Sequence, residues 1–113
     1  MKKNIGSFYF KQTENGNLLG EFSNNSMDNN TTESADIIKI EDAVFIGNYK
    51  SSWIENENAE LLNLNIKLET NSKIYKLTWY KNVIDKPTFF GKGFIVDKIL
   101  VGNYQDFQIE KNS

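Results

Sequence analysis

Alternating apolar and polar positions dominate this chain and predict β-strands. The clearest case is Leu61–Glu69, where Leu62, Leu64, Ile66 and Leu68 alternate with polar side chains. A half-buried strand produces this period of two, whereas a helix repeats its apolar positions at about 3.6 residues. Comparable segments, most of them alternating, are Ile5–Gln12, Leu18–Asn24, Ala35–Ile40, Val44–Trp53, Lys73–Lys81, Thr88–Val96 and Ile99–Gln105.

Short turns separate most of these segments. Asn15-Gly16 is a strong hairpin signal, because both residues accept a positive φ, and Asp97-Lys98 leaves room only for a very tight turn. Strands joined so closely must pair antiparallel, since a parallel pair needs a long crossover. We therefore expect an all-β fold: an eight-stranded antiparallel up-and-down meander, closed or nearly closed into a barrel, with little or no helix. A curved open sheet and a two-sheet sandwich are the alternatives.

One stretch departs from this pattern. Residues 24–34 are polar and low in complexity, which is typical of a long mobile loop. Asp36–Phe45 is the one candidate helix, but its β-branched and aromatic residues favour a strand. At 113 residues, we expect residues 1–113 to form a single barrel-like domain.

The composition excludes several kinds of chemistry. The chain has no Cys and no His, and all 13 basic residues are Lys. Disulfides, Cys nucleophiles, zinc sites built on Cys or His, and every His-dependent triad are therefore ruled out. We expect no cofactor, and any site must use Tyr, Trp, Ser, Asn, Lys or carboxylate groups.

The charge distribution bears on partners. The net charge is −2 and the Lys residues are scattered, so we expect no nucleic-acid partner, which would want a clustered basic surface. No window is apolar enough to span a membrane, and Met1-Lys2-Lys3 is followed by polar residues rather than by a signal-peptide core. We expect a cytoplasmic protein, or the mature form of a secreted one.

Polar aromatic side chains form the best candidate site. Buried Tyr and Trp need partners for their O–H and N–H groups, and a bound ligand can supply them. The residues in phase with the apolar strand faces are Tyr49, Ser51, Trp53, Tyr75, Trp79 and Tyr104. They predict an aromatic-lined barrel mouth that binds a small apolar or aromatic ligand. The competing interpretation is a barrel interior that side chains fill completely.

Carboxylates give no comparable signal for catalysis. Those considered all lie in predicted turns, where acids are ordinarily solvated: Glu14, Asp42, Glu55, Glu57, Asp85 and Asp97. Asp28 and its Asn neighbours lack the Gly and the spaced Glu of a calcium loop, so no metal site is expected. We expect no enzyme. An enzyme would instead show a buried carboxylate with a strongly raised pKa inside a cleft.

An interaction domain is the alternative to ligand binding. Phe89, Phe90 and Phe94 cannot all face one side of a strand, because successive side chains point to opposite faces. An exposed Phe89/Phe90 pair would favour a structural or protein-interaction role, including a homo-oligomer formed through exposed aromatic strands.

Several segments resemble the avidin type of eight-stranded barrel, within the lipocalin-like group. The similar patterns are Leu18-x-Gly20-x-Phe22-x-Asn24, Phe45-x-Gly47-x-Tyr49-x-Ser51, Leu77-x-Trp79-x-x-Asn82 and Phe89-Phe90-Gly91-Lys92-Gly93. Uncharacterised bacterial β-domains with Tyr75, Leu77 and Trp79 followed by Gly91 and Gly93 are similar too, which implies a bacterial source. The resemblance implies a barrel fold.

The same resemblance does not extend to the biotin site. The first strand has Phe8-Tyr9-Phe10-Lys11 where the avidin pattern needs Asn and Ser. Phe22 and Asn24 stand where the second strand of that pattern has Tyr and Ser. Only Tyr49, Ser51 and Trp79 match, so biotin binding is not expected.

Overall fold

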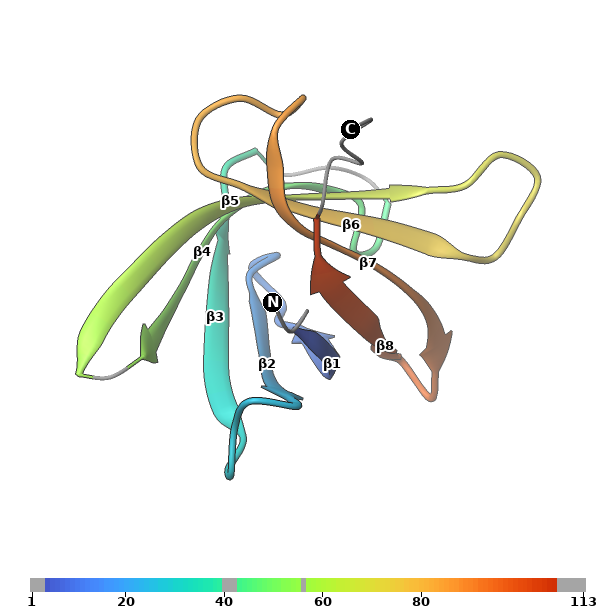
Figure 1. Ribbon diagram of the computed structural model, residues 1–113. Coiled ribbons are helices and arrows are strands. Elements are labelled where there is room, and N and C mark those ends of the chain that lie inside the picture. Colours follow the sequence, from blue (N-terminus) through green and yellow to red (C-terminus); the bar gives the residue numbers. More distant parts are fainter. Residues whose placement is uncertain (1–3, 40–42, 56, 108–113) are drawn as a thin grey trace, which may run out of the picture.

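The computed structural model describes residues 4–39, 43–55 and 57–107, and these residues form an all-β structure without a helix (Figure 1). The expectations placed on Met1-Lys2-Lys3, Ile40 and Asp42 concern residues outside these ranges. The strands are β1 (Ile5–Gln12), β2 (Leu18–Asn24), β3 (Thr31–Ile37), β4 (Gly47–Glu55), β5 (Asn58–Leu68), β6 (Tyr75–Tyr80), β7 (Pro87–Val96) and β8 (Ile99–Asp106). Over the described ranges there is accordingly no helix that could cross a membrane.

The strands close into a barrel in sequence order, and the prediction of a closed up-and-down meander is confirmed. Every strand pairs antiparallel with its neighbours in the chain, and β8 pairs with β1 to complete the ring. Phe8 of β1 lies opposite Phe22 of β2 on one side and opposite Gly102 of β8 on the other. Figure 1 shows β1 between these two neighbours. Closure leaves no strand with an unpaired edge.

The loop predicted at residues 24–34 is shorter than expected. Asn24 ends β2 and Thr31 begins β3, so residues 31–34 of the predicted loop form strand instead. Their polar sequence resembles a loop, but the sheet pairs Glu33 with Gly20 on one side and with Trp53 on the other. Thr31 and Thr32 suit a strand, and backbone pairing on both sides orders this polar segment although its composition is typical of a loop.

The interior is filled by one apolar residue in every two along the strands. On β5, for example, Leu62, Leu64 and Ile66 are buried while Leu61 and Lys67 are exposed. The buried apolar side chains are Phe8, Phe10, Leu18, Phe22, Ala35, Phe45, Tyr49, Leu62, Leu64, Ile66, Leu77, Trp79, Leu100 and Tyr104. Burial of this face is the main favourable term in folding.

Close strand approach requires glycine at position 20. A Cβ atom placed there would lie 1.8 Å from the carbonyl oxygen of Tyr9. No side chain fits at that distance without moving β1 or β2. Gly20 thus permits the tight coiling of a small barrel, as glycine inside a strand often does.

Phe45 closes one end of the barrel. Its backbone adopts a left-handed conformation, with φ of 68°, and its side chain is 1% exposed. The Tyr49 hydroxyl donates to the Phe45 carbonyl at 2.8 Å, and the Phe45 N–H donates to Gln12 Oε1 at 2.8 Å. The Phe45 ring also meets the Tyr75 ring edge to face, with centroids 6.4 Å apart. We call this the closed end.

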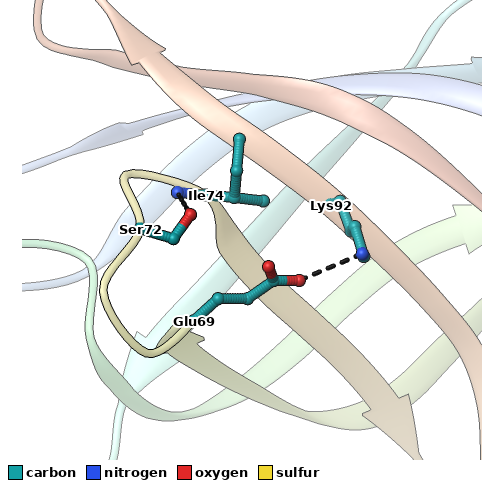
Figure 2. A network of polar contacts seen from close by, with 4 residues as sticks. All are labelled: Glu69, Ser72, Ile74 and Lys92. Atoms are coloured by element: carbon teal, nitrogen blue, oxygen red, sulfur yellow. Dashed lines mark hydrogen bonds and ion pairs between the residues drawn. The ribbon is translucent and has the colours of Figure 1, made fainter.

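Polar contacts at the closed end also fix the β5–β6 hairpin (Figure 2). The Ser72 Oγ accepts a hydrogen bond from the Ile74 N–H at 2.9 Å, which stabilises the turn. Lys92 Nζ on β7 lies 3.0 Å from Glu69 Oε1. This ion pair is half exposed, so its contribution to stability is of order 1 kcal/mol or less.

Candidate functional site

A cavity lies at the end of the barrel opposite Phe45. There β1, β3, β5 and β7 begin and β2, β4, β6 and β8 end. The cavity has a volume of about 90 Å³, and its walls are mostly aromatic. It is lined by Asn4, Phe8, Phe22, Asn24, Glu33, Trp53, Glu55, Trp79, Phe89 and Tyr104. We call it the mouth cavity.

Larger hollows lie on the outer surface of the barrel and at the closed end, where one of about 200 Å³ beside the β1–β2 turn is lined by residues that include Gln12, Gly16 and Ile37 but by no aromatic ring of the described residues. One on the outer surface, of about 250 Å³, is lined by residues that include Ser7, Tyr9 and Glu21, which lie on the outward faces of β1 and β2. No buried ionisable side chain lines it. The mouth cavity is the better candidate site, because its walls combine apolar rings with buried polar groups.

Glu33 lies at the inner wall of the mouth cavity and is only 3% exposed. Strand alternation directs it inward, because it shares a face of β3 with the fully buried Ala35. Trp79 Nε1, on the opposite wall, donates to Glu33 Oε2 at 2.9 Å. The Ser51 hydroxyl donates to the same oxygen. The carboxyl group is therefore held in place by donors from two different strands.

Burial raises the pKa of Glu33 from 4.5 to about 7, although the hydrogen bonds from Ser51 and Trp79 act in the opposite direction. Desolvation disfavours the charged carboxylate, and the two donors restore only part of the lost hydration. Near neutral pH the group is thus divided between its protonated and ionised forms. Such groups cluster at functional sites, where their cost in stability is retained for another purpose.

Trp53 carries a buried donor without a partner. Trp53 lies directly opposite Glu33 across β3 and β4, so the side chains of Trp53 and Glu33 face the same side of the sheet. The Trp53 ring meets that of Phe22 edge to face, with centroids 5.6 Å apart. Its Nε1 atom is buried and makes no hydrogen bond within the described part of the chain. An unpaired buried donor costs about 1–3 kcal/mol.

Tyr104 completes the aromatic wall. Its ring lies about 6 Å from the rings of Phe22, Trp79 and Phe89. Asn24 Nδ2 donates to its hydroxyl oxygen at 3.0 Å. Burial raises the pKa of Tyr104, so the hydroxyl keeps its proton at neutral pH. The hydroxyl hydrogen is thus available as a donor, because the bond from Asn24 uses only the oxygen.

The structure separates the predicted site residues into two groups. Trp53, Trp79 and Tyr104 line the mouth cavity. Ser51 does not line it but supports Glu33 from beside it. Tyr49 and Tyr75 lie at the closed end, where Tyr49 bonds the Phe45 carbonyl and Tyr75 packs against the Phe45 ring.

The sequence analysis missed Glu33, although a signal was present. Glu33, Ala35 and Ile37 alternate with the polar residues at 34 and 36, which is the period of a strand. Assigning residues 24–34 to a loop hid this alternation. Glu33 is a buried carboxyl group with a raised pKa beside a cavity. This is the feature that we expected an enzyme to show.

The remaining candidates lie as follows. Glu55 is exposed at the rim of the mouth cavity. Phe89 is half-buried and lines that cavity, so Phe89 and Phe90 do not form an exposed pair. Phe90 packs against Phe107, with centroids 5.9 Å apart. Within residues 4–39, 43–55 and 57–107, no three acidic side chains gather as metal ligands would.

Comparison with family models found none that matches this chain, and comparisons with curated proteins and with solved structures found no significant match. The resemblance to avidin-type barrels therefore stays a prediction.

Proposed function

We propose that this protein is a non-catalytic binding module that holds a small apolar or aromatic group in its mouth cavity. The observation that carries the proposal is the difference between the two ends of the barrel. At one end Phe45 and its hydrogen bonds fill the barrel interior, and the hollow beside the β1–β2 turn has no aromatic lining among the described residues, whereas the other end has a cavity with aromatic walls and a buried carboxyl group. Small-molecule sites combine such walls with a few polar groups that orient the ligand.

The unpaired indole of Trp53 supports this proposal. The side chain lines the cavity, and its buried Nε1–H has no acceptor among the described residues. A ligand with an acceptor atom would remove the cost of that unpaired donor. The polar groups of the wall thus favour an occupied cavity over an empty one.

Binding accounts for the site better than catalysis does. Glu33 has the pKa of a general acid or base, but mechanisms that pair such a group with a nucleophile or a second carboxylate need that partner within reach. Among the described residues, the other ionisable side chains that line the cavity are Glu55, exposed at the rim, and Tyr104, which stays protonated. Within residues 4–39, 43–55 and 57–107, no Lys lines the cavity. A single fixed carboxyl group suits recognition of a ligand.

The size of the cavity favours the alternative, a structural or protein-interaction domain with a filled core. Its volume of about 90 Å³ is well below the roughly 300–1,000 Å³ of common ligand sites. The hairpin of β7 and β8 also exposes Phe94, Ile95 and Val96, an apolar surface that a partner or a second copy could cover.

The two tryptophans provide the test. We would record the indole Nε1–H resonances of Trp53 and Trp79 by NMR, assign them with the Trp53→Phe and Trp79→Phe variants, and titrate n-butanol and benzyl alcohol. Binding in the mouth cavity predicts saturable shifts of both resonances, because both rings line it. Amide resonances near Phe45, at the closed end, should not move.

If no small molecule in a wider panel shifts the indole resonances, the binding proposal is wrong and the filled-core alternative stands. Light scattering then decides between its two forms. A dimer or larger assembly would support a homo-oligomer through the exposed strands. A strict monomer would instead support an interaction with a different protein.

A further inference from the structure

The polar groups of the mouth cavity indicate the charge of its ligand. Two carboxyl groups line the cavity, Glu33 at its inner wall and Glu55 at its rim, and none of the described residues that line it is a Lys. The other wall residues are aromatic or carry neutral amide and hydroxyl groups. The faces of Trp and Tyr rings attract cations, because the ring quadrupole is negative there. Both features favour a cationic group.

The hydrogen bonds of Glu33 indicate which of its oxygen atoms a ligand would contact. Both of its hydrogen bonds, from Ser51 and Trp79, reach Oε2. Within the described part of the chain, no hydrogen bond reaches Oε1. Glu33 lines the cavity and is 3% exposed as a residue, and Oε1 is not among the fully buried unpaired atoms, so this oxygen is reached from the cavity. An N–H donor from a ligand in the cavity would pair it.

The size of the cavity limits the ligand. A cavity of roughly 150 Å³ holds a benzene molecule, and the mouth cavity is smaller, at about 90 Å³. It encloses a short aliphatic chain, or one end of a longer or aromatic molecule whose remainder protrudes from the mouth. Glu55 is exposed at the rim, so the remainder of a longer ligand would leave the barrel beside a second negative charge.

Resting on the proposed function, we propose that the mouth cavity binds a primary alkylammonium group, which donates to Glu33 Oε1 and lies between the rings of Trp53, Trp79 and Tyr104. The alkyl carbons contact the aromatic walls. The ammonium group has no acceptor atom, so an acceptor for the Trp53 Nε1–H must come from another part of a longer ligand. The ammonium group supplies the charge that compensates the buried carboxylate, as charged groups buried in proteins require.

This arrangement links binding to the protonation of Glu33. Among the described residues, the ionisable groups that line the cavity with Glu33 are Glu55 on β4 and Tyr104 on β8. The negative charge of Asp106 on β8 further raises the pKa of Tyr104. Below about pH 7 Glu33 is mostly protonated in the free protein, so binding the cation must release that proton. The apparent affinity for the ammonium group should therefore increase with pH, by up to about tenfold per pH unit below pH 7, and should level off above pH 7.

The experiment compares n-butylammonium with n-butanol, a neutral molecule of nearly the same shape, by titrating the indole resonances of Trp53 and Trp79. At about pH 8 we expect n-butylammonium to bind at least tenfold more tightly. Its affinity should fall towards about pH 5, while that of n-butanol should change little. Glu33→Gln should remove both the preference and the pH dependence. The control Glu14→Gln, an exposed site in the β1–β2 turn at the closed end, should retain them.

The outcomes separate this inference from the proposed function. Equal affinities for the two probes, or a preference that Glu33→Gln leaves intact, would overturn the ammonium proposal while the binding function stood. Absence of binding by either probe or by the wider panel would overturn both. If Glu33→Gln does not fold, the pH dependence of the unmodified protein decides, because a pH-independent preference for the ammonium excludes Glu33 as its partner.

Discussion

Burial of Glu33 should make the stability of this protein fall as the pH rises towards neutrality. The pKa of the carboxyl group is raised from 4.5 to about 7, and the group is 3% exposed. Each tenfold change in proton affinity is worth about 1.4 kcal/mol, so the shift corresponds to about 3 kcal/mol. Domains of this size have a free energy of unfolding of roughly 5–15 kcal/mol, which makes this a large share.

The sign follows from proton binding. Below about pH 4.5 Glu33 is protonated in the folded and the unfolded chain, and its burial carries no electrostatic cost. Between about pH 4.5 and pH 7 the folded protein binds more protons than the unfolded chain, so the free energy of unfolding decreases with rising pH. Above about pH 7 the full cost of about 3 kcal/mol is present.

The Glu33→Gln variant removes this titration. Its amide oxygen accepts hydrogen bonds as the carboxylate oxygen does, so the contacts with Ser51 and Trp79 can persist. We expect the free energy of unfolding of the variant, relative to the unmodified protein, to rise by about 3 kcal/mol between about pH 4.5 and pH 8. Urea unfolding followed by tryptophan fluorescence measures it, with Glu60→Gln at an exposed position as the control. Parallel pH profiles for Glu33→Gln and the unmodified protein would refute the reasoning.

Three further predictions test the packing around the site and at the closed end. Ser51→Ala removes a hydrogen bond that lowers the pKa of Glu33, so carboxyl ¹³C NMR should show that pKa above about 7; an unchanged or lower value would contradict the assignment. Phe45→Ala empties the closed end and should lower the free energy of unfolding by about 3–5 kcal/mol in urea, and a loss under about 1 kcal/mol would show that Phe45 is not a core residue. Gly20→Ala places a Cβ atom against the Tyr9 carbonyl and should cost more than about 1 kcal/mol, whereas Lys76→Ala on the exposed face of β6 should stay within about 0.5 kcal/mol.

Local signals in the sequence predicted most of the fold. Alternation gave the strands and the side chains that face inward, and turn residues such as Asn15-Gly16 marked where strands reverse. These features depend on neighbouring residues alone, because the pleat repeats every two positions and a tight turn needs particular backbone angles. The polar segment before Ala35 was the exception, since its pairing on both sides could not be seen in its composition.

The candidate site depended on the tertiary structure. Alternation places Tyr49, Trp53 and Trp79 on inward faces, but it does not say how far along the barrel axis each side chain lies. Strand register and tilt decide that height, and they put Tyr49 beside Phe45 and both tryptophans at the mouth. The bond between Trp79 and Glu33 joins residues 46 positions apart in the sequence. The sequence by itself therefore determined which residues face inward, and only the closed barrel decided which of them share a cavity.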